Sequence, residues 1–465
     1  MIATRRTMLG LMAGGAAAAT ACSAQERPPQ RSSSPRRLAR APYIHELFTG
    51  VGRGDPVIDT AAFELAARTG LFKLAPGVRY VLRRGVRIRK DDAGFVCDTG
   101  TATIAMLTAA GEFDLGAQED GKAYGPSHVG LDVLNVQNVV LAGIDFELQS
   151  NRDVRCAIAV AIRGGSNALI DSCSARGFDL PWRGIFTLQS CPNARLQSIA
   201  VRDCGSSKDI AQLLKDGRGR AAQPQVTGIE IDNDTLGGVW SSNAAINGVV
   251  VERLELTGAA SLHGQQTDAV NIQSKGDCGI TVSQLRTSRV GEALDNFSSG
   301  MVARDIIADD TYFSPIKLIH GASRCRVEGV RIRRTGFSGV QIANAVGATV
   351  EYNEVSGVTA DDIGIHHDRW CPVLALPAGV YFDGGAPDVQ GRKASAVSNN
   401  VVRGTFNGHA DRMPVLARQI SPEAASTAFG NRFIGDGSGY SALAEVIGEG
   451  GALRVNGRLT KGGRA

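Results

Sequence analysis

The stretch "NVVLAGIDF" (138–146) sets a pattern that much of the chain repeats. A turn residue comes first, the apolar residue Leu141 follows it, and a second apolar residue, Ile144, comes three positions later. The same pattern recurs in "NALIDSCSA" (167–175), "NARLQSIAV" (193–201), "NGVVVERLEL" (247–256), "CGITVSQL" (278–285), "SGMVARDII" (299–307), "SRCRVEGVRI" (323–332), "GATVEYNEV" (347–355) and "SNNVVRGTF" (398–406). Short apolar runs between Gly, Asn and Ser corners are typical of β-strands.

The spacing of this pattern indicates a solenoid. Its first apolar residues lie 21 to 31 positions apart, except for two gaps of 55 and 52, at Leu141, Ile170, Leu196, Val251, Val282, Ala303, Val327, Val350 and Val402. The two long gaps are near twice the others, so we expect one further turn hidden in each. A unit this short cannot bury an apolar face alone, whereas stacked units share a continuous core. Because no L-x-x-L-x-L frame is sustained, the repeat favours a parallel β-helix over a leucine-rich repeat.

Composition agrees with an all-β chain and argues against a nucleic-acid partner. The 465 residues include 57 Gly and only 5% aromatic residues, which suits many turns and short strands. The formal charge is +4, but residues 1–40 hold seven Arg and one Glu, which is +6, so the remainder carries 4 − 6 = −2. A nearly neutral folded part lacks the basic footprint of nucleic-acid binding.

The entry to the repeats resembles a known family. The segment "DTAAFELAARTGLFKLAPGVRYVLRRGVRI" (59–88) resembles the start of pectate-lyase-like, right-handed parallel β-helix proteins, where an Asp-x-x-Ala-Phe helix precedes a Pro-Gly-x-x-Tyr strand entry. The resemblance covers about residues 55–410. It implies an all-β, single-stranded right-handed parallel β-helix with an N-terminal capping helix. The apolar face of that helix is expected from Ala61, Ala62, Phe63, Leu65, Ala66 and Leu71. The family includes lyases, glycosidases, epimerases and phage tailspikes, so it does not define the activity.

The N-terminus predicts export. Residues 1–24 place Arg5-Arg6 before an apolar stretch from Met8 to Ala19, which is typical of a twin-arginine signal and predicts a periplasmic or secreted protein. Cys22 offers a lipid anchor as an alternative, the only membrane contact that we expect. Residues 25–40 are rich in Pro, Ser and Arg and read as a disordered linker. The β-helix domain then spans 41–465, with the cap at about 55–90, rungs at about 90–410, and a C-terminal cap or tail at about 411–465.

Eight cysteines follow Cys22, and none of them forms a C-x-x-C pair, which argues against a zinc site. Several fall at strand positions, where a free thiol acts as a small apolar residue. We therefore expect buried thiols.

Charged residues recur at the pitch of the helix. A second strand-like run precedes each repeat, and five of these runs start 23 to 25 residues apart, at 267, 292, 315, 338 and 362. Parallel strands lie about 4.8 Å apart, so outward side chains of successive runs become neighbours on one surface patch. The patch is predicted to contain Asp268, Glu292, Asp295, Lys317, His320, Gln341, Asn344 and His366. Which of Glu292 and Asp295 points outward is left open, because a bulge would exchange them.

A polysaccharide lyase is the first interpretation of this patch. Removing the C5 proton of a uronate needs an unprotonated base, for which Lys317 and His320 are candidates. Asp268, Glu292 and Asp295 would hold a hard cation such as Ca2+, which neutralises the substrate carboxylate. Arg304 and Arg324 lie in adjacent repeats and would assist.

Two alternatives stay open. A glycoside hydrolase needs a pair of carboxyl groups, such as Asp268 with Asp295 or Glu292. The Asn-Thr-Asp and Asp-Asp motifs of polygalacturonase-like enzymes are matched only in part, by "QTD" and "ALD". The other alternative is a scaffold that binds glycan without chemistry. In each case the expected partner is a polysaccharide, with Gln341, Asn344, His366 and Trp240 as further contacts; the oligomeric state is not predicted.

Overall fold

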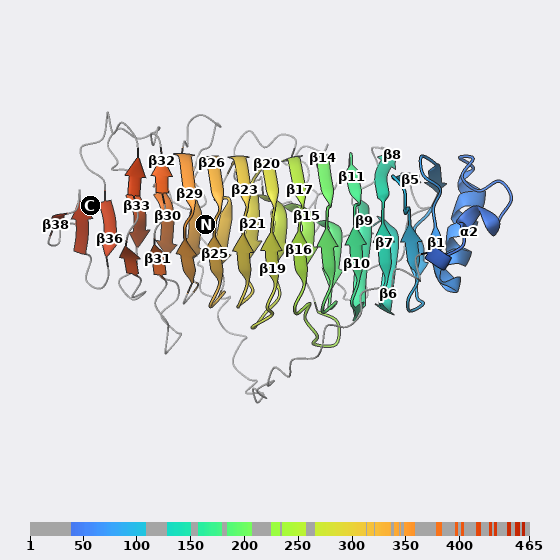
Figure 1. Ribbon diagram of the computed structural model, residues 1–465, viewed down its shortest axis with the longest axis horizontal. Helices are drawn as coiled ribbons and strands as arrows, with labels where there is room; N and C mark the ends of the chain where they lie inside the picture. The colour runs from blue at the N-terminus through green and yellow to red at the C-terminus, as the bar shows by residue number, and fades with distance from the viewer. Residues whose placement is uncertain are drawn as a thin grey trace, which may run out of the picture.

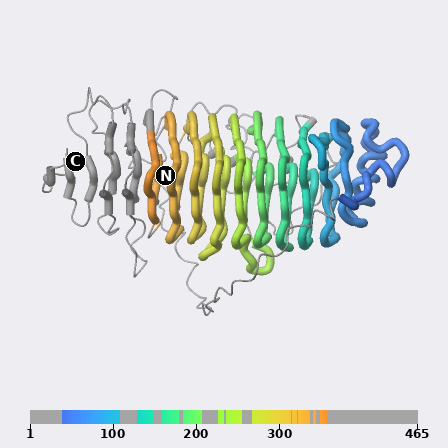
Figure 2. The backbone as a smooth tube through the Cα atoms, viewed as in Figure 1, coloured from blue at the N-terminus to red at the C-terminus, as the bar shows by residue number. Residues whose placement is uncertain are grey.

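The protein is an elongated stack of coils (Figure 1). The computed structural model describes residues 39–107, 128–149, 157–178, 184–206, 225–232, 235–256, 266–312, 314–319, 321–335, 339–343, 345 and 348–358, and then the strands from β30 to β38. Figure 2 shows the coils following one another in sequence order along the long axis. No helix in the described ranges is long and apolar enough to cross a membrane.

Each coil contributes one strand to each of three sheets, because every third strand in the chain is paired. The first sheet contains β1 (Leu71–Lys73), β4 (Gly94–Val96), β7 (Val140–Ala142), β10 (Leu169–Asp171), β13 (Arg195–Gln197), β16 (Ala245–Asn247), β19 (Thr281–Ser283), β22 (Val302–Arg304), β25 (Arg326–Glu328), β28 (Thr349–Glu351), β31 (Ala396–Ser398) and β34 (Thr427–Phe429). The second contains β2 (Arg79–Leu82), β5 (Ala102–Leu107), β8 (Ile144–Gln149), β11 (Ser174–Arg176), β14 (Ala200–Ser206), β17 (Val250–Leu256), β20 (Arg286–Val290), β23 (Ile307–Thr311), β26 (Arg331–Thr335), β29 (Glu354–Val358), β32 (Val401–Arg403) and β35 (Arg432–Ile434).

The third sheet is the longest and positions the site. It contains β3 (Val86–Ile88), β6 (His128–Gln137), β9 (Ala157–Ser166), β12 (Gly184–Gln189), β15 (Gln225–Ile231), β18 (Gln266–Ile272), β21 (Glu292–Asn296), β24 (Ile316–Ile319), β27 (Val340–Ala343), β30 (Ala378–Asp383), β33 (Val415–Gln419), β36 (Ala444–Ile447), β37 (Ala452–Val455) and β38 (Arg458–Thr460). All its pairs are parallel up to β36, whereas β36, β37 and β38 pair antiparallel. The predicted parallel β-helix is confirmed, and parallel pairing continues beyond residue 410.

The repeated sequence pattern is the corner between the first and second sheets. From β10 to β29 only two residues separate the two strands, and the first of them has a left-handed φ, for example 54° at Ser198 and 53° at Gln284. The second residue points into the core, as Ile199 and Leu285 do. An apolar residue, a left-handed turn and another apolar residue therefore recur once per coil.

The two long gaps do not hide extra turns, so that prediction is wrong. Strand β13 pairs directly with β16, and β28 pairs directly with β31. The true members of the stacked column are Ile246 and Val397, in place of Val251 and Val402. The additional residues sit within single coils: 207–224 and 359–377 both join a strand of the second sheet to one of the third. A coil accepts such insertions because its ladders depend on the strands and not on the length of a corner.

A helix closes the N-terminal end of the stack, after a 3-10 turn, η1 (Ile44–Glu46). Helix α2 (Pro56–Thr69) begins at the N-cap Asp55 and buries Ala62, Phe63 and Ala66, which confirms the predicted capping helix (Figure 1). Phe63 packs on Phe95 with ring centroids 4.6 Å apart. The predicted apolar face is shifted: Ala61 and Leu65 are exposed, and Ala67 is buried instead.

The six cysteines in the described residues are free and buried, as expected: Cys97, Cys173, Cys191, Cys204, Cys278 and Cys325.

We expect Asp59→Ala to loosen the cap from the first coil. Asp59 is fully buried and accepts hydrogen bonds from the Gly52 and Val81 backbone N–H groups at 2.6 and 2.8 Å. Leaving two buried donors unsatisfied should lower the free energy of unfolding by about 2–5 kcal/mol in urea titrations. The control Asp55→Ala removes only an exposed N-cap and should cost about 1 kcal/mol. Equal losses in the two variants would contradict this account.

Candidate functional site

A β-bulge in the third sheet places the acidic side chains together. The backbone N–H groups of Ala293 and Leu294 both donate to the Pro315 carbonyl, at 2.9 and 2.8 Å, so two residues of β21 face one residue of the next coil. Both Ala293 and Leu294 then join the core, and the residues on either side of them, Glu292 and Asp295, face outward together. The sequence left open which of Glu292 and Asp295 points outward, and in the structure both of them do.

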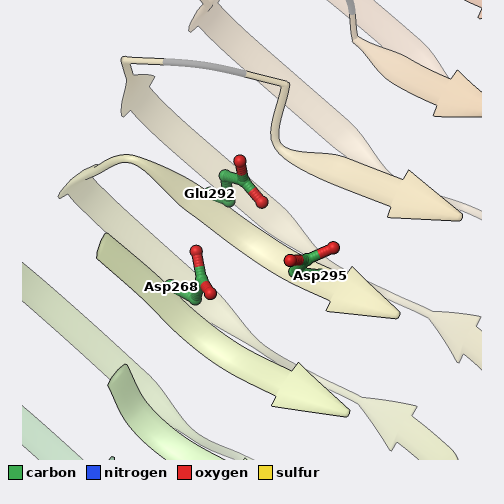
Figure 3. Close-up of side chains that lie close together, drawn as sticks. All are labelled: Asp268, Glu292 and Asp295. Carbon is green, nitrogen blue, oxygen red and sulfur yellow. The ribbon is translucent and has the colours of Figure 1, made fainter. Parts of the chain in front are cut away.

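Strand β18 repeats the arrangement one coil earlier. Ala269 and Val270 both belong to the core, and the residues flanking them are Asp268 and Asn271. Asp268 aligns with Glu292, and Asn271 aligns with Asp295. Figure 3 shows the three carboxylates on one side of the two strands. One oxygen of each carboxylate lies within 4.8 Å of the others.

Two side chains bind this carboxylate cluster (Asp268, Glu292 and Asp295). Lys317, aligned with Asp295 on the next strand, places Nζ 2.8 Å from Glu292 Oε1 and 3.7 Å from Asp295 Oδ2. Asn271 Nδ2 donates to Asp268 Oδ2 at 2.8 Å and lies 3.4 Å from Asp295 Oδ2. The site as a whole therefore contains the three carboxyl groups of the cluster, one ammonium group and one amide.

The cluster lies outside the core but is not exposed, so the expectation of a solvent-exposed patch is wrong. Asp268 and Asp295 are 0% exposed and Glu292 is 4% exposed. The Lys317 side chain keeps an exposed fraction of 12%. Alternation along a strand predicts which face a side chain takes, but not what else covers that face.

Burial explains the proton affinities of the cluster. Desolvation raises the pKa of Glu292 well above its ordinary value of 4.5, more than Lys317 lowers it, and the charges of Asp295 and Asp268 raise it further. Desolvation also raises the pKa of Asp295 against the opposing effect of Lys317. Burial alone would lower the pKa of Lys317, but the three carboxylates outweigh it and raise that pKa. The surroundings thus favour the protonated form of Lys317, and burial favours the neutral forms of Glu292 and Asp295.

The donor set of the cluster suits a hard divalent cation. Glu292 Oε2 and Asp295 Oδ1 are buried and have no hydrogen-bond partner in the described structure, nor does Asn271 Oδ1. Carboxylate and amide oxygens are the ligands that Ca2+ prefers. The Lys317 ammonium, however, already brings positive charge to the same place, so the predicted Ca2+ would compete with it.

The other predicted site residues are distributed differently. Gln341 aligns with Lys317 and is buried. Arg304 ends β22 in the first sheet, and Arg324 is an exposed residue that pairs with Asp277 at 2.7 Å, so neither lies on a strand of the third sheet. Trp240 is half-buried against the core, in the connection between β15 and β16.

Three predicted residues, His320, Asn344 and His366, lie outside the described residues. The run 362–368 was expected to be the strand that follows β27 in the third sheet. That prediction is wrong, because β27 pairs with β30, where Tyr381 aligns with Gln341. Asn353, in the corner before β29, accepts from the Val330 N–H at 2.9 Å and is 1% exposed.

Asn271 is the member of the site that the sequence prediction missed. A signal for it was present: "DAVN" (268–271) and "EALD" (292–295) share an acidic residue, Ala, an apolar residue and a second polar residue. Aligning the two runs by this pattern places Asn271 opposite Asp295 without a structure.

We expect Lys317→Met to destabilise the protein in a pH-dependent way. Removing one partner of a buried ion pair typically costs about 3–5 kcal/mol of unfolding free energy. Because the pKa of Glu292 is raised in the folded state, folding favours the protonated carboxyl, and stability falls as pH rises through the raised value. The loss should therefore be smallest near pH 4.5 and grow as the pH rises above it, as urea midpoints would show. Lys275→Met, an exposed lysine, is the control and should change little; a pH-independent loss at Lys317 would contradict the assignment.

Comparison with known proteins identifies the fold. No family model matches the chain, and no curated protein matches its sequence. The A-module of the mannuronan C-5 epimerase AlgE6 from Azotobacter vinelandii is 14% identical, with a TM-score of 0.50, over 84% of this chain and 95% of that one. A tailspike protein of E. coli bacteriophage HK620 in complex with hexasaccharide is 12% identical, with a TM-score of 0.42, over 85% of this chain and 77% of that one.

An alginate lyase from Paenibacillus sp. is 11% identical, with a TM-score of 0.37, over 81% of this chain and 96% of that one. At these identities the likeness concerns architecture alone. The strand pairing gives the chain the right-handed parallel β-helix fold, and the likeness to the AlgE6 A-module, at a TM-score of 0.50, agrees with it.

Proposed function

We propose that the protein is a carbohydrate-active enzyme that hydrolyses glycosidic bonds of an extended polysaccharide at the carboxylate cluster. The observation that carries this proposal is the gathering of three carboxyl groups on one sheet face, with one oxygen of each within 4.8 Å of the others, where burial raises the pKa of Glu292. A long, straight face of stacked strands also suits a linear polymer better than a small ligand.

Hydrolysis needs an acid and a second carboxylate with different proton affinities. Glu292 would protonate the leaving oxygen, because burial and its acidic neighbours raise its pKa. Asp295, beside the Lys317 ammonium at 3.7 Å, would act as nucleophile or base, and Asn271 would orient the carboxyl groups. Oxygens within 4.8 Å of one another are closer than the about 6.5–9.5 Å that an inverting enzyme uses, which favours the retaining arrangement.

β-Elimination, the first expectation from the sequence, is the second candidate. Lys317 is a poor base here, because the carboxylates raise its pKa and hold its proton. A protonated Lys317 would instead neutralise the carboxylate of a bound uronate, which elimination also requires. The base would then come from another residue.

A scaffold that binds glycan without chemistry is supported by the burial of the cluster. The exposed fractions of the three carboxyl groups are 0–4%, so a sugar cannot reach them as they stand. A catalytic role therefore requires a movement that uncovers these groups during turnover.

Export by the twin-arginine signal is part of the proposal. The six free, buried thiols among the described residues suit a chain that folds under reducing conditions and then crosses the membrane already folded.

We expect Glu292→Gln and Asp295→Asn to lower kcat about 10²- to 10⁴-fold on the substrate polysaccharide while the fold is kept. Activity of the wild type should fall as pH rises through the raised pKa of Glu292, because the acid then loses its proton. Glu328→Gln, on the first sheet, is the control and should retain activity.

Two product assays on a panel of neutral and acidic polysaccharides separate the candidates. New reducing ends without ultraviolet-absorbing products support hydrolysis, and unsaturated ends indicate elimination. Binding without either product, unchanged in both variants, would favour the scaffold and overturn the proposal.

A further inference from the structure

The capping helix α2 has a second apolar face, on the side turned away from the stack. Val57, Ala61 and Leu65 follow one another at intervals of four residues, so their side chains form one stripe along the helix. Val57 is 55% exposed, Leu65 is 45% exposed, and Ala61 is exposed as well. The opposite face, with Phe63 and Ala66, is the one that packs on the stack. A capping helix needs only that inner apolar face, so the outer one calls for a partner.

Positive charge flanks this apolar stripe (Val57, Ala61 and Leu65). Arg68 lies three residues after Leu65 and shares its face, and Arg53 lies two residues before the N-cap Asp55. Both arginines are exposed, and within the described part of the chain neither forms an ion pair.

The acidic residues of the helix offset little of this charge. Asp59 is fully buried, and Glu64 pairs with Arg84 at 2.6 Å. Asp55 is exposed, but its carboxylate accepts hydrogen bonds from the first backbone N–H groups of the helix, at 2.8 and 3.2 Å. The outer face therefore combines apolar side chains with arginines at both ends.

The whole capped end is basic, whereas the rest of the chain is acidic. Residues 41–92 hold nine Lys and Arg against six Asp and Glu, which is +3, and residues 93–465 hold 34 against 39, which is −5. Residues 1–40 carry a further +6, and the chain enters the fold at this same end, where the Pro42 carbonyl accepts from the Lys73 N–H of β1 at 2.8 Å. Such a charge difference along an elongated molecule orients it at a negatively charged surface.

We propose that the outer face of α2 docks on an anionic phospholipid surface, with the apolar stripe between Arg53 and Arg68. An interfacial helix binds in this way, with apolar side chains at the boundary of head groups and acyl chains and arginines beside the phosphates. Because α2 closes one end of the long axis (Figure 1), docking leaves the three sheets projecting from the membrane. The inference goes beyond the proposed function, does not depend on hydrolysis at the carboxylate cluster, and adds a membrane contact that the sequence alone does not predict.

The test measures binding of the full chain to two kinds of vesicle, phosphatidylcholine alone and phosphatidylcholine mixed with phosphatidylglycerol. Residues 1–40 are present in every variant, so differences between variants report on the helix. Arg53→Gln and Arg68→Gln should each weaken binding to the mixed vesicles about 5-fold at low salt, and this loss should shrink at high salt. Leu65→Gln should weaken binding about 10-fold at both salt concentrations, because burial of apolar surface is not screened.

Each change on the helix has a matched control elsewhere on the molecule. Arg195→Gln replaces an exposed arginine on β13, and Val239→Gln replaces a residue that is 49% exposed in the connection between β15 and β16. Both controls should bind as the wild type does. Thermal melting of each variant checks that it folds.

Equal binding by the helix variants and their controls would overturn the proposal. Binding of the wild type to neutral vesicles as tightly as to the mixed ones, or to neither, would do so as well. A lower molar mass of Leu65→Gln in light scattering, with unchanged vesicle binding, would instead identify the stripe as a contact between two copies of the chain and overturn the membrane surface.

Discussion

The left-handed corner between the first and second sheets is the constraint on which the rest of the structure depends. From β10 to β29 each coil passes from the first sheet to the second through two residues, and a left-handed φ at the first turns the chain within that short distance. A non-glycine residue in this conformation costs about 1 kcal/mol, and the stacking of coil on coil offsets it. At a neighbouring corner, left-handed asparagines stack directly: Asn167 donates to Asn138 at 3.1 Å, and Asn193 donates to Asn167 at 3.3 Å. Fixed corners keep the registers of all three sheets in step, so residues one coil apart become neighbours.

The carboxylate cluster is a product of that regularity and of a departure from it that β18 and β21 share. Constant pitch brings Asp268, Asp295 and Lys317 onto adjacent strands. The bulge at Ala293 then turns Glu292 to the same face, which simple alternation along the strand does not allow. Without the bulge, Glu292 would point into the apolar core. Site and scaffold thus meet where two consecutive residues of a strand both join the core, in β18 as well as in β21.

The fold could be predicted from the sequence because apolar side chains recur once in every coil. The column Leu141, Ile170 and Leu196 is visible without coordinates, and so is the pitch that unites the cluster. The length of a connection cannot be predicted from the apolar pattern. For that reason the prediction placed Val251 in the column where the structure has Ile246. The bulge depends on the Pro315 carbonyl of the next coil, and the burial of the cluster depends on what covers that face of the sheet. Those features arise from tertiary contacts that a local pattern does not contain.

The two ends of the stack bear on how the protein behaves in a crowded solution. A parallel coil presents the same row of unpaired backbone groups at each end, so an open end is a template for a second copy. Helix α2 covers one end, and the antiparallel strands β36 to β38 change the direction of pairing at the other. At the C-terminal end this reversal concerns the third sheet alone, since the first and second sheets end at β34 and β35 in parallel pairing. Helix α2 thus covers a whole end of the stack, whereas the reversed strands interrupt the parallel ladder of one sheet in three.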